Sequence, residues 1–200
     1  MSLFGNNSNY GSYFTCRSLY SNLTQLKLFK FRANVFLPFC TDELLFRYNF
    51  KKQITDLTIT DRGGKVGRTD QTTNNVLHNL KCFSLTYQSL TNEYDNQVVR
   101  FLRKMCNLQD LTLYIQIKER NRLVNGIQLE NNVLIYLSKL QTFGFYICIF
   151  TSGNHTATSL SNDDNQLTFS NVKFGRAGCS ISHINEFDIT YNVFSLPFKF

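Results

Sequence analysis

Three residues near the C-terminus follow the chain order of a hydrolase triad. Cys179, His183 and Asp188 supply a nucleophile, a base and a carboxylate that could orient the base. No oxyanion-hole motif accompanies them, and nothing close in sequence would activate the thiol. Ordinary strand residues account for all three. We therefore expect a protein that is not an enzyme and has no catalytic residue.

Cysteine spacing bears on metal binding and on the redox compartment. Six cysteines are spread along the chain without a C-x-x-C pair: Cys16, Cys40, Cys82, Cys106, Cys148 and Cys179. Zinc sites need closer pairing than this, so we expect no metal and no cofactor. In a reducing compartment these side chains are best interpreted as small buried hydrophobes.

Basic residues suggest a second kind of site. The glycine-rich run from Arg62 to Arg68 does not have phosphate-loop spacing, and we interpret it as a flexible loop after a strand. The net charge is +7. Basic side chains follow the predicted strands and would gather along one rim if the strands stack: Arg62, Lys65, Arg68, Lys118, Arg120 and Arg122. This rim is either a solvated edge or a surface that attracts phosphates and acidic proteins.

A repeat organises the elements that would position these residues. The pattern apolar-x-x-apolar-x-apolar occurs five times, and its copies begin at Leu23, Ile54, Leu80, Leu108 and Leu140. These starts are separated by 31, 26, 28 and 32 residues, at or just beyond the roughly 20–29 residues of leucine-rich repeats. The last apolar positions of each copy alternate with polar ones, which predicts a short strand with one buried face.

Helical periodicity separates the predicted strands. Apolar stripes predict helices over 97–107, 130–139 and 41–48, with a weaker one over 74–79. Asp95 or Asn96 would cap the first of these. Strand, loop and helix in repeated order predict parallel strands joined by right-handed crossovers. The expected fold is α/β: a leucine-rich-repeat-like solenoid with a curved parallel sheet, outer helices and a C-terminal β-strand pair.

The repeat also predicts a register. Three rows of aligned side chains would line a concave sheet face, and they are Gln25, Asp56, Cys82, Asp110 and Thr142; Lys27, Thr58, Ser84, Thr112 and Gly144; and Phe29, Thr60, Thr86, Tyr114 and Tyr146. Small central residues beside aromatic ones suit close approach by a protein. The residues that we expect to contact a partner are Lys27, Phe29, Asp56, Thr58, Ser84, Thr86, Asp110, Thr112, Tyr114 and Tyr146.

Four segments organise the chain. We expect a polar N-terminal segment at 1–20, the repeat array at 21–150, a mobile Ser-, Thr- and Asn-rich loop at 151–165, and a C-terminal β segment at 166–200, which could be a truncated array. Alternation predicts two C-terminal strands, 179–184 and 189–196, paired antiparallel. No signal peptide or membrane span is evident, so we expect a cytoplasmic or nuclear protein.

Three sequence blocks resemble one known family. L-S-K-L-Q-T-F-G-F-Y-I at 137–147, Q-L-T-F-S-N at 166–171 and V-F-S-L-P-F at 193–198 are similar to the F-box leucine-rich-repeat proteins of bdelloid rotifers. The resemblance runs from about residue 54 to the end. It implies a substrate receptor of a cullin-RING ubiquitin ligase. No F-box occurs in this chain, so the ligase adaptor would be a partner only if an F-box were supplied elsewhere.

These observations favour a non-catalytic repeat scaffold that binds a protein. Two alternatives remain open from the sequence. The basic rim could bind nucleic acid or phosphate, although no nucleic-acid motif is present. The chain could also be a degenerate fragment without a partner of its own.

Overall fold

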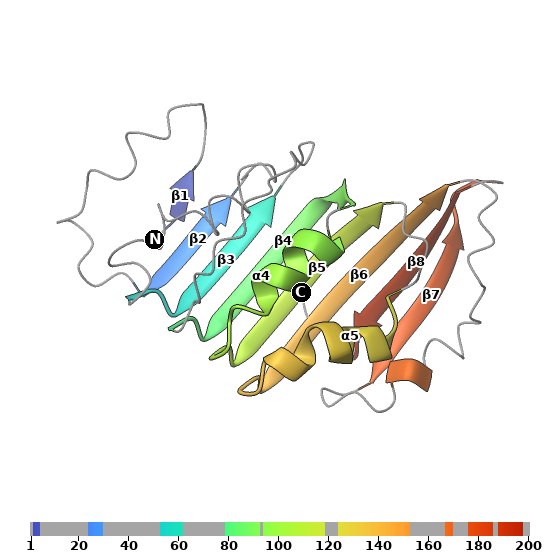
Figure 1. Ribbon diagram of the computed structural model, residues 1–200. Coiled ribbons are helices and arrows are strands. Elements are labelled where there is room, and N and C mark those ends of the chain that lie inside the picture. The colour runs from blue at the N-terminus through green and yellow to red at the C-terminus, as the bar shows by residue number, and fades with distance from the viewer. Residues whose placement is uncertain are drawn as a thin grey trace.

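The computed structural model is an α/β protein built on one open, mostly parallel sheet (Figure 1). It describes residues 2–4, 24–29, 53–61, 79–92, 94–118, 124–152, 167–169, 176–185 and 188–197. The sheet has 8 strands in the order β1-β2-β3-β4-β5-β6-β8-β7. The strands are β1 (Ser2–Phe4), β2 (Gln25–Phe29), β3 (Asp56–Asp61), β4 (Cys82–Thr91), β5 (Asp110–Lys118), β6 (Thr142–Ser152), β7 (Ala177–His183) and β8 (Asp188–Ser195).

The five predicted strands are neighbours in chain order. β2 to β6 pair in parallel, each with the next, as the repeat requires. Two details differ from the prediction. β4, β5 and β6 have 10, 9 and 11 residues, so they are not short strands. β1 lies within the polar N-terminal segment predicted at 1–20, where no strand was expected, and it adds one more parallel strand beside β2.

The predicted register is confirmed along all three rows. Asp56 lies opposite Cys82, which in turn lies opposite Asp110. Tyr114 lies opposite Tyr146 in the third row. Because a shift of one residue would turn every side chain to the other face, the period-2 alternation of apolar residues sets this register.

One backbone pattern recurs where consecutive units meet. At each of four junctions a carbonyl just before a strand accepts two consecutive N–H groups from the next unit, at 2.7 to 3.1 Å. The accepting carbonyls and their donors are Thr24 with Thr55 and Asp56, Thr55 with Lys81 and Cys82, Lys81 with Gln109 and Asp110, and Gln109 with Gln141 and Thr142. Both lone pairs of each oxygen are used, which holds the strand starts level.

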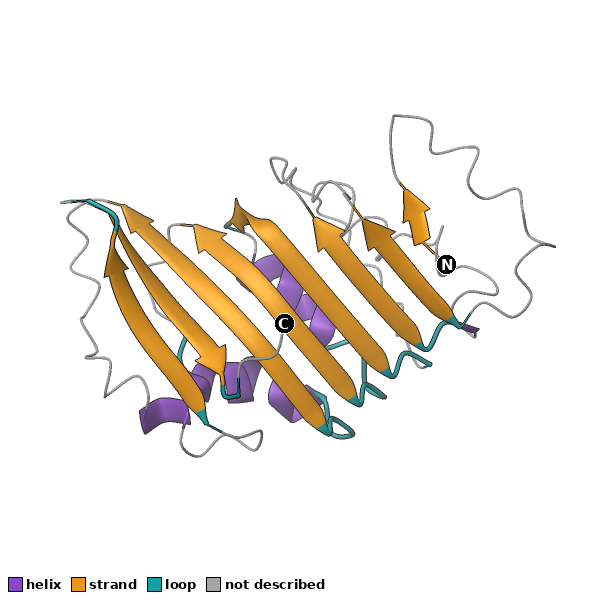
Figure 2. Ribbon diagram, turned by 180° about the vertical axis from the view of Figure 1, so that it is seen from behind, coloured by secondary structure: helices purple, strands orange, loops and turns teal. Residues whose placement is uncertain are grey.

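Helical segments cover one face of the sheet (Figures 1 and 2). A π-helical turn, η2 (Tyr94–Val98), leads into α4 (Val99–Leu102), while α5 (Gly126–Asn132) leads into a 3-10 turn, η3 (Leu134–Tyr136). The predicted bounds were wrong. The first helical segment begins at Tyr94, so Asp95 lies inside its first turn, and the helix predicted over 130–139 begins at Gly126. The helix predicted over 41–48 lies outside the described residues. So does the weaker helix predicted over 74–79, of which only Asn79 is described.

The core lies between the sheet and these helices. Strand residues alternate in burial, so Phe83, Leu85, Leu111 and Leu113 are almost fully enclosed. Phe83 meets Phe101 of α4 edge to face, with ring centroids 5.6 Å apart. Burying this apolar layer is the main favourable contribution to folding.

The chain changes direction after β6. β8 lies antiparallel between β6 and β7, so the pair of antiparallel strands predicted at the C-terminus is present and extends the sheet. β6 continues to Ser152, into the predicted loop, whose remaining residues 153–165 lie outside the described part. Residues 167–169 form a helical turn in place of the β structure expected there. No helix within the described ranges is long and apolar enough to cross a membrane.

Candidate binding surface on the sheet

The sheet has one face that no described helix covers, which we call the open face. Figure 1 shows α4 and α5 in front of the sheet, and the reverse view in Figure 2 shows them behind it. Open-face side chains are the half-buried positions of the strands, such as Ser84, Thr112 and Tyr114. Polar residues therefore occupy a surface that apolar residues would fill if it were core.

The predicted contact residues gather on this face. Lys27 is exposed, whereas Asp56, Thr58, Ser84 and Thr86 are half-buried at the alternating outward positions of their strands. Asp110, Thr112, Tyr114 and Tyr146 continue the same rows on β5 and β6. Phe29 has the predicted register on β2, but its side chain lies outside the described set.

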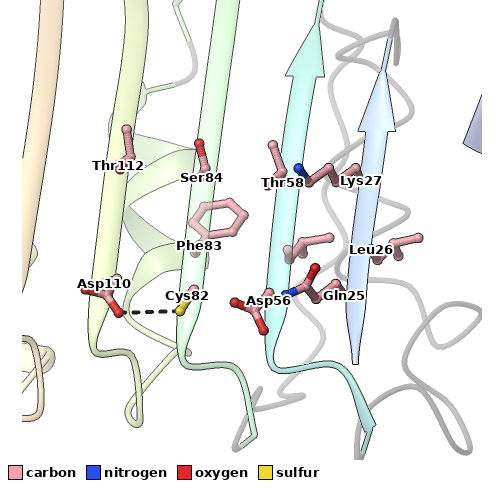
Figure 3. A pocket seen from close by; sticks show the side chains of 11 residues that line it. Gln25, Leu26, Lys27, Asp56, Thr58, Cys82, Phe83, Ser84, Asp110 and Thr112 are labelled. Carbon is pink, nitrogen blue, oxygen red and sulfur yellow. Dashed lines mark hydrogen bonds between the residues drawn. The ribbon is translucent and has the colours of Figure 1, made fainter. Parts of the chain in front are cut away.

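A shallow hollow of about 270 Å³ lies over β2 to β5 (Figure 3). Its lining comes from open-face positions of these four strands and from the residues between them, and it includes Gln25, Lys27, Asp56, Cys82, Ser84 and Asp110. Sites for small molecules usually measure roughly 300–1,000 Å³ and are mostly apolar. The hollow is therefore smaller and more polar than most sites that enclose a whole small molecule.

Cys82 lies between two carboxylates in the hollow. Its thiol donates to Asp110 Oδ2 at 3.4 Å (Figure 3), and Thr142 Oγ1 donates to the other oxygen of Asp110. Thr55 Oγ1 donates to Asp56 Oδ2 at 2.6 Å. Burial raises the pKa of the Cys82 thiol to about 12, and hydrogen bonds and repulsion from Asp56 and Asp110 act in the same direction. The thiol therefore stays protonated and is a poor nucleophile at neutral pH.

An aromatic row crosses the open face from β5 to β8. The rings of Tyr114 and Tyr146 stack with centroids 4.8 Å apart and planes at 14°. Phe194 continues the stack beyond Tyr146 at 6.5 Å and 20°. Tyr146 Oη donates to Asn192 Oδ1 at 2.9 Å, and burial raises the pKa of this tyrosine. We name Tyr114, Tyr146 and Phe194 the aromatic row.

Gly178 leaves the space that Phe194 occupies. A Cβ built on Gly178 would lie 2.5 Å from Cε2 and 2.7 Å from Cζ of the Phe194 ring. These two residues face each other across β7 and β8. Local sequence alternation does not identify Phe194 as part of this stack, because its position depends on β8 pairing with β6.

The triad-like residues do not form a catalytic site. Cys179 and His183 lie on β7, four residues apart, which is about 13 Å along a strand. Asp188 starts β8, and its carboxylate accepts from Asn185 Nδ2 at 2.7 Å. Burial raises the pKa of the Cys179 thiol. The separation of Cys179 from His183 and the raised pKa of the thiol argue against nucleophilic catalysis by this trio.

The other predicted features are only partly visible. Lys118 is exposed at the end of β5, while Arg62, Lys65, Arg68, Arg120 and Arg122 lie outside the described residues. The four described cysteines are outside disulfides and are half-buried, so the prediction that they are buried small hydrophobes was wrong for these four. Cys82 differs most from the predicted apolar surroundings, because it lies among polar side chains of the open face. Within the described ranges no group of His, Cys, Asp and Glu could hold a metal ion.

Comparison with known proteins adds no relative: no family model, no curated protein and no solved structure matches this chain.

Proposed function

We propose that the protein is a non-catalytic repeat scaffold that binds a protein partner on its open face. We also propose that the repeated units form a leucine-rich-repeat-like solenoid with a curved sheet and helices on its outer side. The repeated carbonyl arrangement at four junctions supports the stacking of equivalent units. The family resemblance adds a role as the substrate-receptor part of a ubiquitin-ligase subunit in the cytoplasm or nucleus.

The aromatic row carries this proposal. Tyr114, Tyr146 and Phe194 are half-buried large rings on a face that no described helix covers. Aromatic side chains fixed by stacking lose little conformational entropy on binding, and they are frequent anchors of protein interfaces. The neighbouring hollow would accept one side chain of the partner, while Ser84 and Thr112 allow close approach.

A binding experiment on both faces tests the proposal. The full chain and its Tyr114→Ala and Tyr146→Ala variants are immobilised and exposed to cell extract treated with nuclease. Tyr136→Ala is the matched control, since Tyr136 is 47% exposed on the helical side. We expect each open-face variant to weaken retention of the same protein about tenfold or more, and the control to retain it.

Raised salt separates this function from binding to nucleic acid. Binding through the aromatic row should persist between about 0.1 and 0.5 M salt, because salt screens desolvated contacts only weakly. Phosphate binding through the basic rim would weaken steeply over the same range. Retention that disappears with nuclease or with salt, and that ignores both tyrosine substitutions, contradicts the proposal.

A further inference from the structure

β7 forms an edge of the sheet, and its composition is unusual for an edge. Its residues, A-G-C-S-I-S-H, include no Asp, Glu, Lys, Arg or Pro. In this respect β7 resembles β4 and β6, which pair on both sides. Edge strands normally carry charges or proline, which block pairing with another chain. β7 lacks these devices, and within the described residues it pairs only with β8.

Alternate residues of β7 direct their backbone groups away from β8. Leu196 N donates to Arg176 O at 2.8 Å, and Ile184 N donates to Asp188 O at 2.9 Å, so the even-numbered positions bond to β8. Hydrogen-bonded and non-bonded pairs alternate along an antiparallel ladder. The odd-numbered residues therefore point their N–H and C=O groups outward, and they are Ala177, Cys179, Ile181 and His183.

We propose that β7 pairs antiparallel with β7 of a second copy of this chain. The four outward-facing residues are symmetric about Ser180, so a two-fold axis at Ser180 matches each donor to an acceptor. Cys179 then lies opposite Ile181 of the other copy, and the two Ser180 residues face each other. This inference concerns the edge of the sheet and is independent of what the open face binds.

The side chains fit this register. Gly178, Ser180 and Ser182 are small and lie on the open-face side, so neither copy obstructs the other. On the opposite side Ile181 is 36% exposed, and pairing would cover it with the half-buried Cys179. A strand pair of this length is small beside interfaces of roughly 1,200–2,000 Å², so the association is weak and depends on concentration.

Net charge gives the pairing a characteristic response to salt. Each copy carries a formal net charge of +7, and β7 has no Asp, Glu, Lys or Arg that could form an ion pair across the interface. Two like-charged bodies repel over about 10 Å at 0.1 M salt. Added salt should therefore strengthen the dimer, whereas an interface built on ion pairs would weaken.

Charge exchange at Ser180 tests the two-fold pairing. Sedimentation equilibrium of the full chain should show a monomer–dimer equilibrium. Ser180→Lys alone and Ser180→Glu alone place like charges opposite each other, and each should raise the dissociation constant about fivefold. An equimolar mixture of the two variants should recover the dimer, because Lys then faces Glu.

Ser182 provides the matched control. Ser182→Lys adds the same charge to a more exposed position of β7, but it lies opposite Gly178 of the other copy, so its effect should be smaller. Ile181→Pro removes an outward N–H without touching the bonds to β8, and it should weaken the dimer more than tenfold. Circular dichroism confirms that each variant is folded.

Three outcomes overturn the pairing. The first is a wild-type chain that stays monomeric at all concentrations and at raised salt. The second is a dimer that Ile181→Pro leaves intact. The third is a Lys and Glu mixture that associates no better than either variant alone. As an independent check, Ser180→Cys should form an intermolecular disulfide under mild oxidation faster than Ser182→Cys, because facing Cα atoms at a two-fold non-bonded pair are about 4.5 Å apart.

Discussion

Gly126→Ala is expected to destabilise the protein, although alanine normally favours a helix over glycine. Gly126 begins α5, and a Cβ built on it would lie 2.2 Å from the backbone oxygen of Thr168. The same glycine donates its N–H to Thr168 Oγ1 at 2.8 Å. A backbone neighbour cannot rotate away as a side chain can. Residues 167–169 must therefore move away from α5.

The magnitude follows from three contributions. Overpacking costs about 1–3 kcal/mol, and loss of the Thr168 hydrogen bond costs about 1 kcal/mol. Replacing glycine with alanine in a helix stabilises the folded state by up to about 1 kcal/mol. The net loss is about 1–3 kcal/mol. Movement of this segment also disturbs Phe169, which is 1% exposed and stacks on Phe145 at 5.8 Å.

Gly144→Ala is the matched control, because a Cβ there would meet its nearest neighbours, Ser195 Oγ and Thr112 Oγ1, at 3.9 Å. This distance is ordinary contact, so alanine should stabilise the strand by about 0.5–1 kcal/mol. Urea unfolding followed by circular dichroism measures both free energies. A Gly126→Ala variant as stable as the wild type would refute the close packing of α5 against residue 168.

Three further substitutions test individual contacts. Asn125→Ala removes the cap that Asn125 Oδ1 provides to Gln128 N at 2.8 Å, and urea unfolding should show a loss of about 1 kcal/mol. Tyr146→Phe keeps the stacked ring and loses the hydrogen bond to Asn192, so the free energy of unfolding in urea should fall by about 1 kcal/mol. An unchanged free energy of unfolding would contradict that hydrogen bond. Asp110→Asn should lower the raised pKa of the Cys82 thiol, because it removes a nearby negative charge. Alkylation of this thiol should therefore become faster between about pH 8 and 10, near the ordinary pKa of a thiol, and mass spectrometry measures the rate. An unchanged rate would contradict the role of the carboxylate.

The parallel strands and their register could be predicted because apolar residues repeat with period 2 at a nearly constant spacing. Leu111 and Leu113 must face the core, and this fixes Asp110, Thr112 and Tyr114 on the other face. The same reasoning predicted two of the three rings of the aromatic row. These features depend on local alternation, which a single sequence displays directly.

The remaining features depend on contacts between distant segments. Asn125 caps α5, and Gly126 at the start of the helix bonds to Thr168, 42 residues further along the chain. The apolar stripe alone therefore placed the start of this helix too late. Phe194 joins the aromatic row only because β8 lies next to β6 in the sheet. Cys82 stands between Lys81 and Phe83 in the sequence, which gives no sign of acidic neighbours, yet strand pairing places it between Asp56 and Asp110. Local sequence patterns do not encode such pairings.

Photo-crosslinking from the two faces of the sheet tests the proposed function most directly. A benzophenone amino acid replaces Thr112 on the open face, or Ile127, which is 58% exposed on α5. Irradiation in nuclease-treated extract should yield one dominant protein adduct from position 112 and little from position 127. Adducts of equal yield from both positions, or adducts only from position 127, would contradict the assignment of the open face as the binding surface.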